Sequence, residues 1–220
     1  MNPKRRKSMF SFFESMSTTW KIISINVACF ILFSILMVTN VLPIQYIAIK
    51  PSSIWEGRYL WTFLTSMFMH GGFLHLFVNM LSLYFVGGLL EKILGQKRFF
   101  WFYMIAGLFS GLLFVLSPLV FTQDLHSFAV GASGALFGLI GVLIFLTPNL
   151  PVYVMFIPIP VKMKYAAPGM LALLWVISIG ANIPIGNVAH LGGLLAGIFY
   201  GIYLRKRFPR KVKFISQKFS

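Results

Sequence analysis

Acidic residues are scarce in this sequence of 220 residues, which has 4 Asp and Glu residues against 19 Lys and Arg residues. Charged residues make up 10% of the chain and hydrophobic residues 58%, whereas soluble domains carry about 25% charged residues. This composition excludes an ordinary soluble globular domain. Cysteine is nearly absent as well, and the one cysteine, Cys29, has no partner for an internal disulfide.

Long apolar runs take the place of the missing charges, and they have the length that a helix needs to cross a bilayer. We predict six spans, at 20–42, 72–91, 99–121, 130–147, 166–182 and 187–204. The segment 148–162 is also apolar, but its prolines favour a loop at the membrane interface over a seventh span. The predicted fold is therefore an all-α membrane protein, a compact bundle of six transmembrane helices.

Basic residues predict the orientation of this bundle. With six spans, only Lys50 and Arg58 of the 19 basic residues fall on one side, and the rest share the side of both termini. The positive-inside rule makes that side cytoplasmic. The predicted organisation is a basic tail at 1–19, a six-span domain at 20–204 and a second basic tail at 205–220. Topology and attraction to anionic lipid account for the net charge of +15, so no nucleic-acid partner is expected.

Five polar side chains lie at a similar depth on three of the predicted spans. His70 precedes the second span, His75 and Asn79 lie within it, Ser133 lies early in the fourth, and His190 lies early in the sixth. These three spans all begin at the external face, so at about 1.5 Å per residue the side chains lie in the outer half of the membrane. Ionisable residues at such depth are rare and usually functional.

Glycines recur at helical spacing in two of the same spans. They are Gly134, Gly138 and Gly141 in the fourth span and Gly193, Gly197 and Gly201 in the sixth. Small residues at this spacing let two helix backbones approach closely in lipid, and we expect these stripes to bring His190 next to Ser133. The alternative is packing without chemistry, with Ser133 bonded to the backbone of its own helix.

Serine beside histidine is the minimal unit of nucleophilic catalysis, because the imidazole takes the hydroxyl proton and returns it to the leaving amine. By this topology two acidic residues are cytoplasmic and two lie in loops, so a Ser133–His190 dyad is more economical than a triad. His75, Asn79 and the backbone N–H of Ser133 are candidate donors to a developing oxyanion. The alternatives are an interhelical hydrogen bond for Asn79 and a structural role at the interface for His70.

Three motifs resemble the rhomboid family of intramembrane serine proteases. They are GASG at 131–134, AHLGGLLAG at 189–197 and HGGFLHLFVN at 70–79, and the likeness runs from about Trp55 to Gly201. The resemblance implies Ser133 as nucleophile, His190 as general base, and His75, Asn79 and the Ser133 amide as the oxyanion hole. It also implies that Gly131 leaves room at the active site and that Glu91 is structural.

Two positions depart from the pattern of this family. Its members often carry Trp-Arg in the first external loop, where this sequence has Trp61–Thr62. Either Arg58 replaces the arginine, or the loop is held differently. Family members also often have a tyrosine stacked on the catalytic histidine, and Phe137 at that position keeps the ring without the hydroxyl.

The function that the resemblance implies is cleavage of transmembrane segments of other proteins near their external end, in a water-filled cavity open to the external face. No cofactor or metal is expected. The alternatives are an inactive rhomboid-like protein that binds membrane clients, a metal-dependent enzyme using His70, His75 and His190, and a transporter. The first usually lacks the serine or the histidine, the second lacks intramembrane carboxylates, and the third lacks inverted repeats. A six-span core without further domains favours a bacterial plasma membrane.

Overall fold

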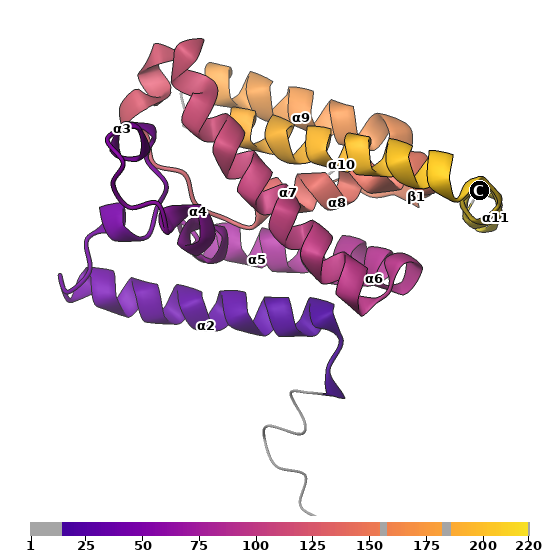
Figure 1. Cartoon of the computed structure of the whole chain (residues 1–220), viewed down its shortest axis with the longest axis horizontal. Coiled ribbons are helices and arrows are strands. Elements are labelled where there is room, and N and C mark those ends of the chain that lie inside the picture. Colours follow the sequence, from indigo (N-terminus) through magenta and orange to yellow (C-terminus); the bar gives the residue numbers. More distant parts are fainter. Residues whose placement is uncertain (1–14, 155–157, 182–185, 220) are drawn as a thin grey trace, which may run out of the picture.

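The computed structural model describes residues 15–154, 158–181 and 186–219, which form a mostly helical molecule (Figure 1). The main helices are α2 (Thr18–Val38), α5 (Phe73–Ser82), α6 (Gly88–Leu94), α7 (Gln96–Leu116), α8 (Ser133–Leu146), α9 (Met163–Gly180), α10 (Asn187–Arg207) and α11 (Pro209–Lys218). A five-residue π-helix, η3 (Leu83–Gly87), joins α5 to α6 in one continuous helical segment. Residues 1–14 of the predicted N-terminal tail lie outside the described residues.

Five helical segments in the described part of the chain are long and apolar enough to cross a membrane. They are α2, Phe73–Leu94, Gln96–Leu119, α9 and α10. Each overlaps one of the predicted spans, with its ends shifted by a few residues. The remaining predicted span, 130–147, contains the 14-residue apolar helix α8. This helix is about 21 Å long at about 1.5 Å per residue, which is less than the hydrocarbon core of about 30 Å.

Helix α8 lies at the centre of the bundle, where it packs against α7, α9 and α10. Of its 14 residues, 11 are buried, including every residue from Gly134 to Leu143. A helix enclosed by protein does not have to match the thickness of the bilayer, because its ends meet protein rather than lipid. Its short length therefore agrees with a central position.

Helices α8 and α10 approach so closely that their backbones touch. A Cβ atom built on Gly193 would lie 1.8 Å from the carbonyl oxygen of Gly134, and one built on Gly197 would lie 2.1 Å from that of Gly138. Any larger residue at either position would force the two helices apart. This contact fixes the relative height and rotation of the two helices.

One end of the molecule holds both the start of α2 and the end of α10 (Figure 1). There the carboxylate of Glu91 accepts hydrogen bonds from the backbone N–H groups of Thr18 at 2.7 Å and Thr19 at 2.8 Å. The Thr19 hydroxyl also donates to it, at 2.6 Å. A carboxylate at a helix N-terminus satisfies free donors and complements the helix dipole, so Glu91 fastens α6 to the first turn of α2.

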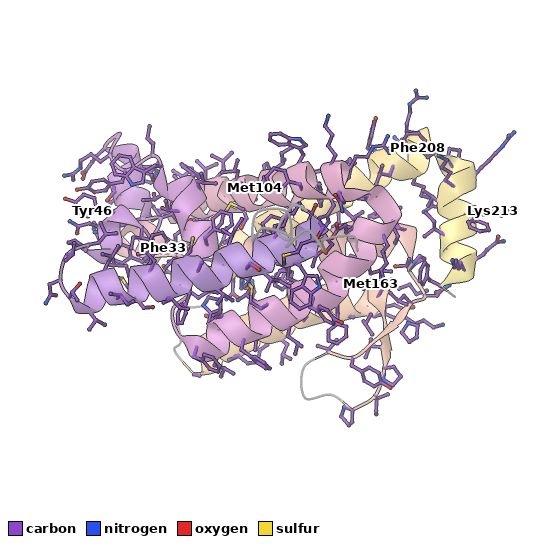
Figure 2. All side chains as sticks on the ribbon, turned by 90° about the horizontal axis from the view of Figure 1, so that it is seen from below. Phe33, Tyr46, Met104, Met163, Phe208 and Lys213 are labelled. Atoms are coloured by element: carbon purple, nitrogen blue, oxygen red, sulfur yellow. The ribbon has the colours of Figure 1, made fainter. Side chains whose placement is uncertain are left out.

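The other end of the molecule carries the segment 43–69, with Tyr46 far from Phe208 (Figure 2). Its short helices are η1 (Ile44–Tyr46), α3 (Pro51–Trp55), α4 (Thr62–Thr65) and η2 (Ser66–Phe68). Arg58 is exposed and pairs with Glu56 in the same segment, whereas Thr62 is buried and its hydroxyl donates to the carbonyl of Tyr59 at 2.7 Å.

Two further contacts tie this segment to the bundle. The indole N–H of Trp55 donates to the carbonyl of Val115 in α7 at 3.0 Å. Ile49 forms an antiparallel bridge with Ala129, in the loop before α8.

The predicted loop at 148–162 contains one piece of regular structure, although residues 155–157 lie outside the described part. Strands β1 (Pro151–Val152) and β2 (Val161–Lys162) pair in antiparallel fashion. They form a short ribbon at the end of the molecule that also holds α11 (Figure 1).

Candidate active site

Ser133 is the first residue of α8 and lies where a loop turns into this buried helix. The turn depends on Gly131, whose φ of +121° is strained for any residue with a side chain. The N–H of Gly131 donates to the carbonyl of Ser66 at 2.8 Å, which holds the loop against η2. The backbone N–H groups of the first turn of a helix have no intrahelical acceptor, so the amide of Ser133 is an available donor.

His190 lies in the first turn of α10, and its imidazole is buried beside Ser133. The distance from His190 Nε2 to Ser133 Oγ is 2.8 Å, which is a hydrogen bond. The ring of Phe137, one turn along α8 from Ser133, stacks on the imidazole with 4.7 Å between centroids and 24° between planes. This geometry suits a nucleophile and a general base, because the proton donor and acceptor are already in contact.

Ser110 of α7 supports the same turn of α10, a role that was not predicted from the sequence. Its hydroxyl donates to the carbonyl of Ala189, the residue before His190, at 2.7 Å. Gly134 and Gly192 give it room, because a Cβ on Gly134 would lie 2.0 Å from Ser110 Oγ and one on Gly192 would lie 3.1 Å from Ser110 Cα. The signal that could have found it is a small polar residue between glycines, in GLFSG at 107–111.

His75 of α5 lies beside Gly131, two residues before Ser133. A Cβ built on Gly131 would lie 2.9 Å from His75 Nε2 and 3.7 Å from Ser133 Oγ. His75 Nδ1 accepts a hydrogen bond from the N–H of Gly71, at 3.3 Å. A neutral imidazole that accepts at Nδ1 carries its hydrogen on Nε2, so this contact makes His75 Nε2 a donor.

Asn79 is buried one helical turn after His75, and its side chain bonds within its own helix. Its Nδ2 donates to the carbonyl of His75 at 2.7 Å. An amide NH₂ group has two hydrogens, so this bond leaves Asn79 a second donor. The bond is neither a bridge to another helix nor a contact with Ser133.

His70 is buried just before α5 and packs edge-to-face on His75, with 5.2 Å between ring centroids and 68° between planes. Burial, together with the nearby His75, lowers the pKa of His70 to about 4. His70 is therefore neutral at pH 7 and supports His75 by ring packing.

The remaining glycines of the predicted stripes contact different partners. A Cβ on Gly138 would also lie 2.5 Å from Cβ of Ala106 in α7, and one on Gly201 would lie 2.8 Å from the ring of Phe145. The α8–α10 contact is thus backbone to backbone near Ser133 and backbone to side chain at its far end.

The described residues hold no group of three or more His, Cys, Asp or Glu side chains arranged to bind a metal ion. His70, His75 and His190 therefore do not form such a group. His190 of α10 instead bonds Ser133 Oγ, and His75 of α5 lies beside Gly131.

Comparison with known proteins gives a consistent set of relatives. A family model described as the rhomboid domain matches residues 57–207. RHOMBOID-like protein 5 of Arabidopsis thaliana is 37% identical over 163 residues, which are 73% of this chain and 48% of that protein. Rhomboid protein 1, mitochondrial, of Saccharomyces cerevisiae is 33% identical over 144 residues, or 64% of this chain and 41% of the relative.

A bacterial relative is named as a protease. Rhomboid protease GluP of Bacillus subtilis is 28% identical over 165 residues, which are 73% of this chain and 29% of that protein. In each of these three comparisons, the match covers less than half the length of the relative. The residues matched by the family model include both Ser133 and His190.

Proposed function

This chain belongs to the rhomboid family, and on that premise we propose that it is an intramembrane serine endopeptidase that cleaves transmembrane segments of other membrane proteins. Ser133 is the proposed nucleophile and His190 the proposed general base. The observation that carries the proposal is the 2.8 Å hydrogen bond between His190 Nε2 and Ser133 Oγ. A relative named as a rhomboid protease supports the reaction class.

The proposed reaction begins when Ser133 Oγ attacks the scissile carbonyl carbon and His190 Nε2 takes the hydroxyl proton. The tetrahedral intermediate carries its negative charge on the former carbonyl oxygen. As it collapses, the C–N bond breaks and His190 returns the proton to the leaving amine, which leaves an acyl-enzyme. Water, deprotonated by His190, then attacks the ester carbonyl carbon. The bond from that carbon to Ser133 Oγ breaks, His190 returns the proton to Oγ, and the carboxylic acid product leaves.

Three donors are proposed for the oxyanion: His75 Nε2–H, the second N–H of the Asn79 amide and the backbone N–H of Ser133. Donors that are aimed in advance at the developing charge lower the barrier without reorganisation. The contact between Gly71 and His75 Nδ1 supports this role for His75, because it places the hydrogen on Nε2. Gly131 is proposed to leave space there for the substrate carbonyl.

The proposed topology treats α8 as the fourth of six spans, within a six-helix domain at 20–204 between basic tails at 1–19 and 205–220. Both termini are proposed to be cytoplasmic, which places Ser133 toward the external face. The location of the α2 start and the α10 end on one side of the molecule supports this topology. A bacterial plasma membrane is the proposed location; the relatives include one from a bacterium and one named as mitochondrial.

The test is labelling by a fluorophosphonate probe, which reacts with activated serine hydroxyls, beside cleavage of a membrane-protein reporter. Ser133→Ala and His190→Ala are each expected to abolish labelling and cleavage in a protein that remains folded. The double variant is expected to be no worse than either single variant, because the pair acts as a unit.

The control is Ser127→Ala, in the loop before α8, where the hydroxyl bonds the carbonyl of Gln123. This variant should keep both labelling and cleavage. Cleavage at the same bond by Ser133→Ala would rule out the proposed mechanism.

A further inference from the structure

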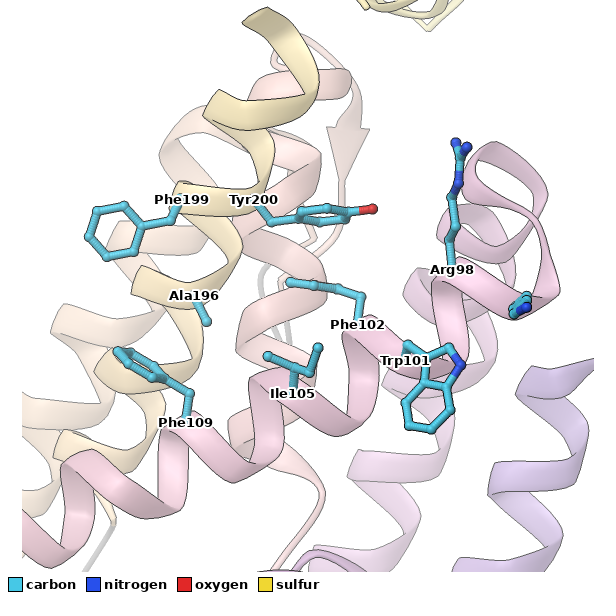
Figure 3. Close-up of a pocket in the computed structure, with 9 residues that line it drawn as sticks. Arg98, Trp101, Phe102, Ile105, Phe109, Ala196, Phe199 and Tyr200 are labelled. Carbon is cyan, nitrogen blue, oxygen red and sulfur yellow. The ribbon is translucent and has the colours of Figure 1, made fainter. Parts of the chain in front are cut away.

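An apolar groove of about 640 Å³ runs along the outer surface of the bundle, between α7 and α10 (Figure 3). Its lining includes Trp101, Phe102 and Ile105 of α7 and Ala196, Phe199 and Tyr200 of α10. The floor is firm, because the Phe102 and Tyr200 rings stack with 4.6 Å between centroids. The rim is accessible, with Trp101 57% exposed and Phe199 62% exposed. In a bilayer this surface faces the acyl chains of lipid.

One end of the groove is cationic. Lys97 and Arg98 line it there, and the Arg98 side chain extends beyond the aromatic part of the groove (Figure 3). Both residues are exposed, and neither forms an ion pair with any described residue. They also occupy the first turn of α7, which has no acidic residue. Cations are unfavourable at a helix N-terminus, so an anion bound beside Lys97 and Arg98 would be stabilising.

More positive charge gathers at the same end, around the ring of Phe208 between α10 and α11. The guanidinium carbons of Arg98 and Arg207 each lie 5.8 Å from the ring centroid, and Lys211 Nζ lies 6.0 Å from it. The nearest acidic side chain in the sequence, Glu91, is buried and bonded to Thr18 and Thr19. The cluster of Lys97, Arg98, Arg207 and Lys211 is therefore not neutralised by a carboxylate of the described chain.

We propose that this groove binds one anionic phospholipid, with its phosphate against Lys97 and Arg98 and an acyl chain along the apolar surface of α7 and α10. The site matches both parts of such a lipid, because positive charge for the headgroup lies at the end of the helices and apolar rings for the acyl chain lie along them. Basic pockets between transmembrane helices bind anionic headgroups. A zwitterionic headgroup would bring its own cation into the cluster.

Other occupants fit this surface less well. A second copy of the chain in the same membrane orientation would bring two unneutralised cationic clusters together, which costs electrostatic free energy. An apolar helix of another protein would fill the groove but leave Lys97 and Arg98 without an anion. The proposal depends on the membrane-spanning fold and is independent of the protease reaction.

The experiment is native mass spectrometry of the full chain in detergent with phosphatidylglycerol or phosphatidylcholine, together with thermal unfolding. The wild-type protein should retain one phosphatidylglycerol in preference to phosphatidylcholine and unfold at a higher temperature with it. The double variant Lys97→Gln/Arg98→Gln should bind phosphatidylglycerol at least tenfold more weakly. Both side chains are exposed, so this change leaves the packing of the bundle intact.

The matched control is Lys162→Gln/Lys164→Gln, which removes two charges near the same end of the molecule but outside the groove. It should bind phosphatidylglycerol like the wild type. Equal losses in both double variants would show diffuse surface attraction and overturn the proposal, as would unchanged binding in Lys97→Gln/Arg98→Gln.

Two further arms test the acyl chain. Ala196→Phe fills the groove and keeps the charges, and in folded protein it should also lose the bound lipid. Glycerol phosphate, which has the headgroup charge and no chain, should not raise the unfolding temperature. The proposed site would be overturned if folded Ala196→Phe bound the lipid as the wild type does. It would also be overturned if glycerol phosphate raised the unfolding temperature as much as phosphatidylglycerol does. The proposed site would also be overturned if the wild-type protein bound no phosphatidylglycerol and a photoreactive residue in place of Phe199 cross-linked two copies of the chain.

Discussion

His190 makes two contacts that together hold the imidazole of the candidate dyad in position. Its Nε2 bonds Ser133 Oγ at 2.8 Å, and its ring face lies against Phe137. The other ring nitrogen, Nδ1, is buried and has no hydrogen-bond partner among the described residues. In a serine triad a carboxylate orients the imidazole through that atom. Here ring stacking by Phe137 supplies the orientation.

A prediction at the residue scale concerns Gly131→Ala. The new Cβ would lie 2.8 Å from His75 Cε1 and 2.9 Å from Nε2, so the imidazole must move. A shift of about 1 Å at a reaction centre can lower the rate about 100-fold, and we expect a loss of that order in turnover of a reporter substrate. The protein should remain folded by circular dichroism.

The matched control for this change is Gly95→Ala. Gly95 also has a positive φ, +82°, but a Cβ there would meet nothing within 4 Å. Both variants carry backbone strain of about 1–3 kcal/mol, and only Gly131→Ala crowds His75. An equal loss of turnover in the two variants would show that backbone strain, and not the position of His75, controls activity.

At the scale of elements, the site depends on the backbone contact of α8 with α10. Ser133 and His190 are separated by 57 residues in the sequence, and each lies within the first turn of its helix. The distance between their side chains is therefore set by the height and rotation of one helix against the other. Gly193 and Gly197 fix both quantities, and Ser110 adds a hydrogen bond from α7 to the same turn of α10.

Gly197→Leu is predicted to separate these helices and to reduce both stability and activity. The added Cβ would lie 2.1 Å from the carbonyl oxygen of Gly138 and 2.8 Å from Cα of Gly141, and backbone atoms cannot rotate away as side chains do. Overpacking typically costs about 1–3 kcal/mol, and Gly197→Ala should cost less than Gly197→Leu. Thermal unfolding and reporter cleavage measure the two effects.

The control for this prediction is Gly169→Leu in α9. Gly169 is exposed, and a Cβ there would meet nothing within 4 Å. This variant should unfold near the wild-type temperature. A Gly197→Leu protein with wild-type stability and turnover would contradict the importance of the α8–α10 contact.

At the scale of the whole molecule, the position of the site restricts what the proposed protease can cut. Ser133 begins α8 and His190 lies in the first turn of α10, so the chemistry lies toward the side of the bundle where these two helices start. The opposite end carries the cationic cluster around Phe208 (Figure 2). A substrate must present its scissile bond at the depth of Ser133, which is the external side in the proposed topology.

A substrate is therefore predicted to need a segment that unwinds easily near its external end. A carbonyl inside a helix is hydrogen-bonded and shielded, and in lipid no water replaces the lost bond. Glycine or proline near the external end lowers that cost. In a single-pass reporter with an external N-terminus, replacing such residues with leucine should suppress cleavage by the reconstituted protein.

The matched reporter carries the same leucine replacements near its cytoplasmic end and should still be cut. Mass spectrometry of the products should place the cut in or just outside the external third of the membrane segment. A cut in the cytoplasmic half would contradict both the proposed orientation and the depth of the site.

Apolar length and short motifs were enough to predict much of this protein from its sequence. Five of the predicted spans correspond to helices long enough to cross a membrane, because a bilayer requires a local property, a run of about 20 apolar residues. The rhomboid family was identified from motifs whose residues are close together in the sequence, and the family comparison confirms it. The roles of Ser133 and His190 stay predictions.

Only the tertiary structure decided which atoms meet. It enclosed α8 as a short central helix, turned the Asn79 amide to the His75 carbonyl of its own helix, and brought Ser110 to Ala189. It also placed Lys97 and Arg98 at the end of an apolar groove. Such contacts depend on the relative height and rotation of helices that are far apart in sequence. Apolar length and periodicity describe each helix by itself, so they carry no information on those two quantities.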